Sequence, residues 1–246
     1  MTRTSSITLG VLATLAALAM GQELDHDIDP GIIMTVENSY RQESVNLMTI
    51  REQSRTESRE MKVLALKNIR GAIDRGITTG EILKALEYMA MEGIVNKTIY
   101  NNRIRNNYPD IRCQAAAYLG DLGSLEAHKI LLKMTQAEYE PMVLTEVVKS
   151  LTKIGMNDNN ETVQMISKRL HAFDVLLPDN LLALAALEAY ETFASKAGGT
   201  LDASTIQVIQ GISTGRYHGT IRERANQLLT MLHTYSLHSR PEDLSE

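Results

Sequence analysis

The sequence predicts an all-α fold that is built from repeated helix pairs. The first observation is an apolar pattern with spacings of 4, 4 and 3 residues, which marks one face of an α-helix. The second is that this pattern occurs five times, with first positions separated by 50, 32, 39 and 39 residues. Helical units that recur at roughly 33–47 residues are typical of an α-solenoid, a fold that presents surfaces to partners. No segment shows the alternation of a β-strand.

Four apolar columns define the repeated pattern. The first column holds Met61, Ile111, Val143, Leu182 and Ile221, and the second holds Ala65, Ala115, Val147, Ala186 and Ala225. The third holds Ile69, Leu119, Leu151, Tyr190 and Leu229, and the fourth holds Ala72, Leu122, Ile154, Phe193 and Leu232. The small second column allows helices to approach closely, and the large third column fills the space between layers. We therefore expect the columns to form the core.

Residues 1–21 have the features of a secretory signal peptide. Arg3 precedes an apolar stretch from Ile7 to Met20, and Ala19 and Gly21 are the small residues that a signal peptidase requires. The stretch of about 14 residues is shorter than the roughly 20 needed to cross a bilayer. We therefore favour cleavage before Gln22 over a membrane anchor. This predicts an exported protein, either periplasmic or secreted, with no membrane span after signal removal.

Residues 22–33 are acidic, and we expect them to form a flexible leader. We expect residues 34–107 to form an irregular N-terminal helical unit. Its expected helices cover about 34–54, 59–75 and 81–92, followed by a short helix to about 106. The first helix is expected to bury Val36, Tyr40, Val45, Met48 and Ile50. Ser58 is a suitable N-cap for the second helix, because a hydroxyl accepts a hydrogen bond from the first turn.

Residues 108–236 predict the regular repeats, and residues 237–246 predict a loose tail. Pro109, Pro141 and Pro178 each open a helix, since the fixed φ of proline suits the first helical turn. Ser124 is expected to cap the helix that runs to about 136. The later helices are expected at about 158–173, 178–197, 202–214 and 220–235.

This layout resembles the HEAT-repeat (armadillo-type) superfamily. The likeness rests on Pro109-Asp110-Ile111-Arg112, Ala115-Ala116 and Leu119-Gly120-Asp121-Leu122-Gly123, and it recurs from Glu140-Pro141 to Ile154-Gly155. It implies a right-handed α-α superhelix of about four to five helix pairs, with no shared active site. Two sequence segments are similar to exported HEAT-repeat proteins of spirochaetes. They are Ile50-Arg51-Glu52-Gln53-Ser54-Arg55 and Asn106-Asn107-Tyr108-Pro109-Asp110. That likeness implies a periplasmic, cell-envelope or flagellar assembly.

The net charge and the Cys, His and acidic residues exclude several classes of function. The chain has 25 Lys and Arg residues and 30 Asp and Glu residues. Removal of the signal peptide would remove Arg3, which leaves 24 basic and 30 acidic residues and a net charge of −6. This negative charge argues against nucleic acid as the main partner. Cys113 is the only cysteine, so no disulfide forms within the chain. The six histidines show no catalytic or metal-ligand spacing. The oxygen-rich stretches 25–29 and 157–161 lack the pattern of a calcium loop and fit a leader and a helix cap better. We expect no cofactor, no metal and no catalytic residue.

A basic and aromatic stretch in the irregular unit is the predicted partner-binding surface. It consists of Lys97, Tyr100, Arg103, Arg105, Tyr108 and Arg112. A second, weaker set is Arg216, Tyr217, Arg222 and Arg224. The leading hypothesis is a non-enzymatic exported scaffold that binds protein partners. The alternative is a binding module for a non-protein envelope ligand, such as an anionic polymer or lipid, and a lyase-like enzyme ranks last.

Overall fold

The computed structural model describes residues 30–174 and 178–238, and α-helices make up most of them. The helices are α2 (Pro30–Arg55), α3 (Arg59–Asp74), α4 (Gly80–Ala90), α5 (Pro109–Leu122), α6 (Leu125–Ala137), α7 (Pro141–Ile154), α8 (Glu161–Asp174), α9 (Asn180–Lys196), α10 (Ala203–Thr214) and α11 (Gly219–His238). The 3₁₀ turn η1 (Asp158–Asn160) precedes α8, and the strands β1 (Ile99–Tyr100) and β2 (Arg103–Ile104) lie between α4 and α5. The predicted all-α class is confirmed. The predicted signal peptide, leader residues 22–29 and tail residues 239–246 lie outside the described residues.

The chain divides after Val45 into two compact units. The described part of the first unit is the beginning of α2, which starts at Pro30 and so replaces the last residues of the predicted leader with helix. In the second unit, Ile50 at the end of α2 is buried as predicted, and Gln53 and Ser54 are buried beside it in sequence. Val45 and Met48 are 61% and 66% exposed. Their predicted burial is wrong, because among the described side chains of α2 the buried ones are Ile50, Gln53 and Ser54, near its end.

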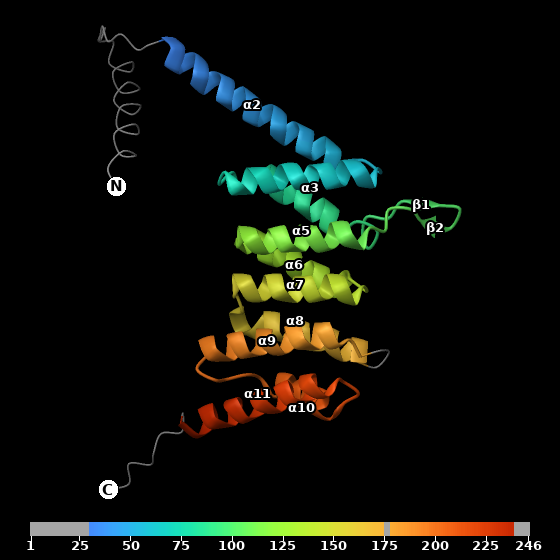
Figure 1. The fold of residues 1–246 in the computed structure, drawn as a ribbon, viewed down its shortest axis with the longest axis vertical. Helices are drawn as coiled ribbons and strands as arrows, with labels where there is room; N and C mark the ends of the chain where they lie inside the picture. The colour runs from blue at the N-terminus through green and yellow to red at the C-terminus, as the bar shows by residue number, and fades with distance from the viewer. Residues whose placement is uncertain (1–29, 175–177, 239–246) are drawn as a thin grey trace, which may run out of the picture. The chain divides into compact units, whose positions relative to one another are not determined.

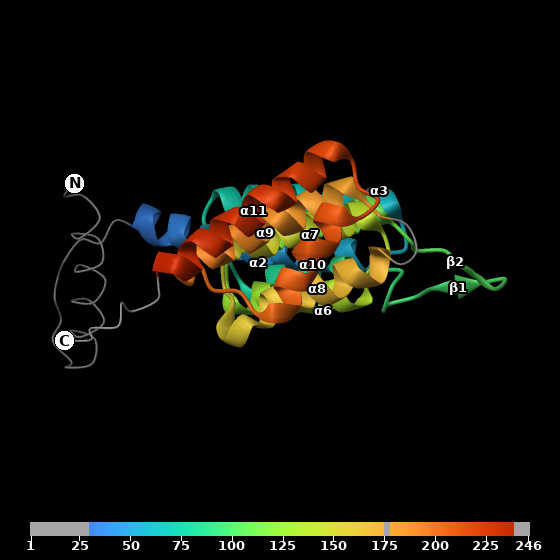
Figure 2. The same cartoon turned by 90° about the horizontal axis from the view of Figure 1, so that it is seen from below.

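The helices of the second unit from α3 onward pack in two rows (Figure 2). In one row α3, α5, α7, α9 and α11 pack successively, and in the other α4, α6, α8 and α10 do so. The rows are joined by contacts between consecutive helices, such as α6 with α7 and α8 with α9. The helix pairs of this unit therefore follow one another in chain order (Figure 1).

The second apolar column lies at the centre of this packing. All five of its residues are 0% exposed. These residues are Ala65, Ala115, Val147, Ala186 and Ala225. Gly120 shows how closely α5 approaches α7, because a Cβ at that position would lie 2.7 Å from Ser150 Oγ. Met61 in the first column is 37% exposed, since α3 is the first helix of its row in this unit and packs on a row neighbour on one side only.

Residues 99–104 form a β-hairpin where the sequence predicted a short helix. Ile99 pairs with Ile104 and Tyr100 pairs with Arg103 in antiparallel register. The turn is closed by Asn101 and Asn102, whose φ angles of 47° and 58° are both positive. Such a turn matches the twist of a hairpin, and asparagine tolerates this conformation better than most residues. The predicted caps, by contrast, are confirmed, since Ser58 and Ser124 accept hydrogen bonds from the first turns of α3 and α6.

Candidate functional site

The hairpin between α4 and α5 projects beyond the helix rows (Figures 1 and 2). Its apolar side chains face solvent, with Ile99 64%, Tyr100 63% and Ile104 43% exposed. The guanidinium of Arg105 lies 5.8 Å from the centre of the Tyr100 ring, within the range of a cation–π contact. A projecting element with exposed apolar side chains is typical of a contact surface.

Cationic side chains surround these apolar residues. Lys97, Arg103 and Arg105 are all exposed on the hairpin and its arms. No Asp or Glu occurs from residue 93 to residue 109, so this local charge of +3 is not balanced by a neighbour in sequence. We define the hairpin surface as Lys97, Ile99, Tyr100, Arg103, Ile104 and Arg105. Four of the six residues predicted from sequence therefore lie together on it.

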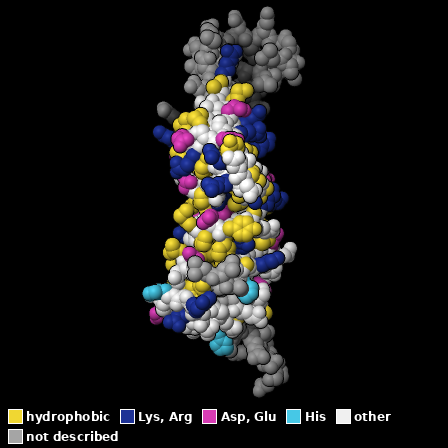
Figure 3. All heavy atoms as spheres, turned by 90° about the vertical axis from the view of Figure 1, so that its right-hand side faces the viewer, with side chains coloured by type: hydrophobic (Ala, Val, Ile, Leu, Met, Phe, Trp, Pro, Cys, Tyr) yellow, Lys and Arg dark blue, Asp and Glu magenta, His cyan; other side chains and the backbone are white. Residues whose placement is uncertain are grey.

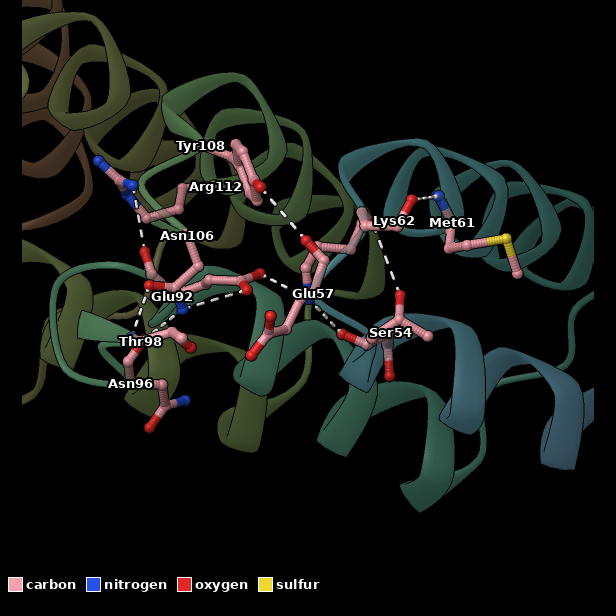
Figure 4. Close-up of polar contacts among 12 residues, drawn as sticks. Ser54, Glu57, Met61, Lys62, Glu92, Asn96, Thr98, Asn106, Tyr108 and Arg112 are labelled. Carbon is pink, nitrogen blue, oxygen red and sulfur yellow. Dashed lines mark hydrogen bonds and ion pairs between the residues drawn. The ribbon is translucent and has the colours of Figure 1, made fainter. Parts of the chain in front are cut away.

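A buried asparagine closes the base of the hairpin (Figure 4). The Asn106 side-chain oxygen accepts a hydrogen bond from the Thr98 backbone N–H at 2.8 Å. Its amide nitrogen donates to the Asn96 carbonyl at 2.7 Å and to Glu92 Oε1 at 3.3 Å. Because Asn106 is 4% exposed and bonds to the opposite arm, it fixes both arms of the hairpin to the helical body.

An ion pair inside the core continues this network. Lys62 Nζ lies 2.8 Å from Glu92 Oε2, and the two residues are 0% and 2% exposed. Lys62 also donates to the Ser54 carbonyl at 2.8 Å, and its ammonium lies 5.3 Å from the centre of the Tyr88 ring. Burial raises the pKa of the Glu92 carboxyl, and the contact with Lys62 opposes this shift. The end of α2, α3 and the base of the hairpin are thereby joined.

Arg112 belongs to the same buried network, so its predicted place on the binding surface is wrong. It is 1% exposed and forms two hydrogen bonds to the buried carboxylate of Glu138, Nε to Oε2 at 2.6 Å and Nη2 to Oε1 at 3.1 Å. Its Nη1 donates to the Glu92 carbonyl at 3.1 Å and to Asn107 Oδ1 at 2.8 Å. The side chain points inward because α5 turns this position toward the end of α6, where Glu138 lies.

Tyr108 lies at the base of the hairpin and not on its exposed part. It is half-buried, and its hydroxyl donates to the Glu57 carbonyl at 3.2 Å. In the second predicted set, Tyr217 is buried and Arg224 pairs with Glu191, whereas Arg216 and Arg222 are exposed. This second set therefore does not form one exposed surface.

Sequence reasoning missed the apolar part of the candidate site. The surface predicted from the sequence does not include Ile99 and Ile104, because their exposure depends on the hairpin. Further exposed apolar residues occur just before or at the start of α7 and α9. They are Tyr139 at 72%, Met142 at 59% and Leu181 at 69% exposed. Figure 3 shows hydrophobic side chains spread over the face that carries the hairpin. We call Tyr139, Met142 and Leu181 the edge residues.

Among the described residues, no three His, Cys, Asp or Glu side chains lie close enough to hold a metal ion. His128 is 5% exposed, its Nε2 lies 2.9 Å from Thr162 Oγ1, and burial lowers its pKa. Cys113 is half-buried, and burial raises the pKa of its thiol, which disfavours the nucleophilic thiolate. Within the same ranges, no helix is both long enough and apolar enough to cross a membrane.

Comparison with protein-family models, curated proteins and solved structures found no match to this chain.

Proposed function

We propose that this chain is a non-enzymatic helical-repeat scaffold of the HEAT type that binds a protein partner through the hairpin surface. The observation that carries the proposal is the contrast between the two ends of the hairpin. Its tip exposes Ile99, Tyr100 and Ile104, whereas its base is fixed by the buried side chain of Asn106. The two rows of helices support a right-handed superhelix as the scaffold.

The fixed base favours recognition. An isolated two-stranded hairpin is only marginally stable in water, so the contacts of Asn106 and Glu92 stabilise a conformation that the strands alone would not keep. A contact element that is already ordered loses less conformational entropy when it binds. The three cations of the surface add electrostatic complementarity to an acidic partner, which favours fast association. These features together favour protein binding.

The proposed setting is the periplasm or the cell envelope. It rests on the signal-like residues 1–21 and on the resemblance to exported HEAT-repeat proteins of spirochaetes, among which a flagellar assembly is one setting. Partner binding there is consistent with a single cysteine, because the fold is stabilised by its core and needs no disulfide.

The test is crosslinking and affinity purification of the tagged chain from its native cells. The variant carries Tyr100→Ser and Ile104→Ser, and the matched control carries Leu125→Ser. Leu125 is 46% exposed, close to the 43% of Ile104, but it follows the opposite end of α5. We expect a partner that is captured by the wild type and the control and lost from the variant. Equal capture by all three proteins would refute the role of the hairpin.

A further inference from the structure

A groove runs along the helices of the second row. One hollow of about 630 Å³ lies between α4 and α6, and another of about 600 Å³ lies between α6 and α8. Gln136 lines both hollows, so they adjoin on α6. We call the two hollows together the α4–α6–α8 groove. It is distinct from the hairpin surface, whose defining residues do not line it.

Cations dominate the lining of this groove. They are Arg55, Lys84, Lys133, Lys168 and Arg169. The acidic lining residues are Glu87 and Glu161. Lys133 pairs with Glu87 at 2.7 Å and Lys84 pairs with Glu81 at 3.0 Å, but no carboxylate among the described residues pairs with Lys168. In a chain whose net charge is −5, a groove with this excess of positive charge is complementary to an anionic ligand.

One of these cations is held in a fixed orientation. The guanidinium of Arg169 lies 5.0 Å from the centre of the Tyr139 ring and 5.1 Å from that of Phe173. Its Nη2 donates to the Glu138 carbonyl, and its Nε is buried without a hydrogen-bond partner. Because Nη2 is already bonded and Nε is buried, a ligand carboxylate would meet the guanidinium at Nη1. A guanidinium in a fixed orientation loses little side-chain entropy on binding.

The rest of the lining indicates which anion fits. Tyr88, Met91 and Val95 line the first hollow, and Met165 lines the second. A uniformly charged polymer would bring its anions against Glu87 and Glu161. A peptide that carries both acidic and apolar side chains satisfies the cations and the apolar lining together.

We propose that the α4–α6–α8 groove binds an extended acidic peptide with interspersed apolar side chains. Lys168 and Arg169 contact its carboxylates in the second hollow. The apolar side chains of the peptide cover Met91 and Met165. This binding does not depend on the hairpin surface, so either site can be lost without the other.

The experiment is a fluorescence-anisotropy titration of the full mature chain with a fluorescein-labelled peptide of alternating glutamate and leucine. Lys168→Glu is compared with Lys149→Glu, which reverses an exposed charge on α7 in the other row. We expect Lys168→Glu to weaken binding about tenfold, the equivalent of about 1.4 kcal/mol. Lys149→Glu and the hairpin variant Tyr100→Ser should leave the affinity within about twofold, and higher salt should weaken binding.

Four results would overturn the proposal. The acidic peptide fails to bind, or a peptide of alternating lysine and leucine binds as tightly. Lys149→Glu or Tyr100→Ser weakens binding as much as Lys168→Glu, which places the site elsewhere. Linear polyphosphate binds in place of the acidic peptide, which makes the groove a site for an anionic polymer. Circular dichroism of each variant establishes that it is folded.

Discussion

Replacing Arg112 by methionine tests whether this residue is a core group or a surface group. The change keeps much of the side-chain volume but removes the charge that neutralises Glu138, which is 0% exposed. Glu138 Oε1 would retain the backbone N–H groups of Tyr139 and Glu140 at 2.9 and 3.0 Å. Its Oε2 would lose the hydrogen bond from Arg112, and Asn107 would also lose a donor.

Removing one partner of a buried ion pair costs about 3–5 kcal/mol. We therefore expect Arg112→Met to lower the free energy of unfolding by about that amount, measured by urea denaturation with circular dichroism. At about 2–4 °C per kcal/mol for a chain of this size, the melting temperature should fall by about 6–20 °C. Adding Glu138→Gln should recover about half of the loss, because it removes the unpaired buried charge and keeps an oxygen for the two N–H groups.

Arg222→Met is the matched control, since Arg222 is exposed on α11. It should change the free energy of unfolding by less than about 0.5 kcal/mol. If Arg112→Met lowered the free energy of unfolding no more than this control, Arg112 would be a surface residue. Its assignment to the buried network that anchors the hairpin would then be wrong.

Three other predictions address packing and protonation. Gly120→Ala should destabilise the fold by about 1–3 kcal/mol, because the new Cβ meets Ser150 on α7; Gly211→Ala, in open space on α10, should instead stabilise it by about 0.5–1 kcal/mol. Leu119→Ala should cost about 2–5 kcal/mol, and Leu119→Asp should abolish the cooperative helical melt seen by circular dichroism. Stability should fall as the pH drops below about 6.5, since burial lowers the pKa of His128 and the unfolded chain takes up the proton first; urea titrations of His128→Gln should show a shallower dependence.

The core could be predicted from the sequence because helix periodicity alone places a residue on a face. Every second-column residue is buried, Pro109 and Pro141 open α5 and α7, and the capping serines begin helices where expected. Pro178 does not open α9 as predicted, because the helix begins at Asn180 with Asp179 as its N-cap. Helix periodicity wrongly predicted that Met61 is buried, because its burial depends on how many neighbours its helix has. It also failed for Val45 and Met48, which are exposed on α2, whereas Ile50, Gln53 and Ser54 further along the helix are buried.

The candidate site was predicted only in part. The stretch around Tyr100 and Arg103 is exposed as expected, but the hairpin that presents it was missed. The signal was available: two adjacent asparagines between Ile99-Tyr100 and Arg103-Ile104 favour a turn with positive φ angles. Arg112 could not be separated from the exposed arginines, because its burial depends on Glu138, which lies 26 residues away in the sequence.

A photo-crosslinking amino acid at position 100 tests the central proposal most directly. Placed in the full chain in its native cells, it should form a discrete crosslink to one protein, identified by mass spectrometry. The same crosslinker at position 125 should not capture that protein. A hairpin that gives no crosslink, or the same products as position 125, would contradict the proposal that the hairpin surface binds a protein partner.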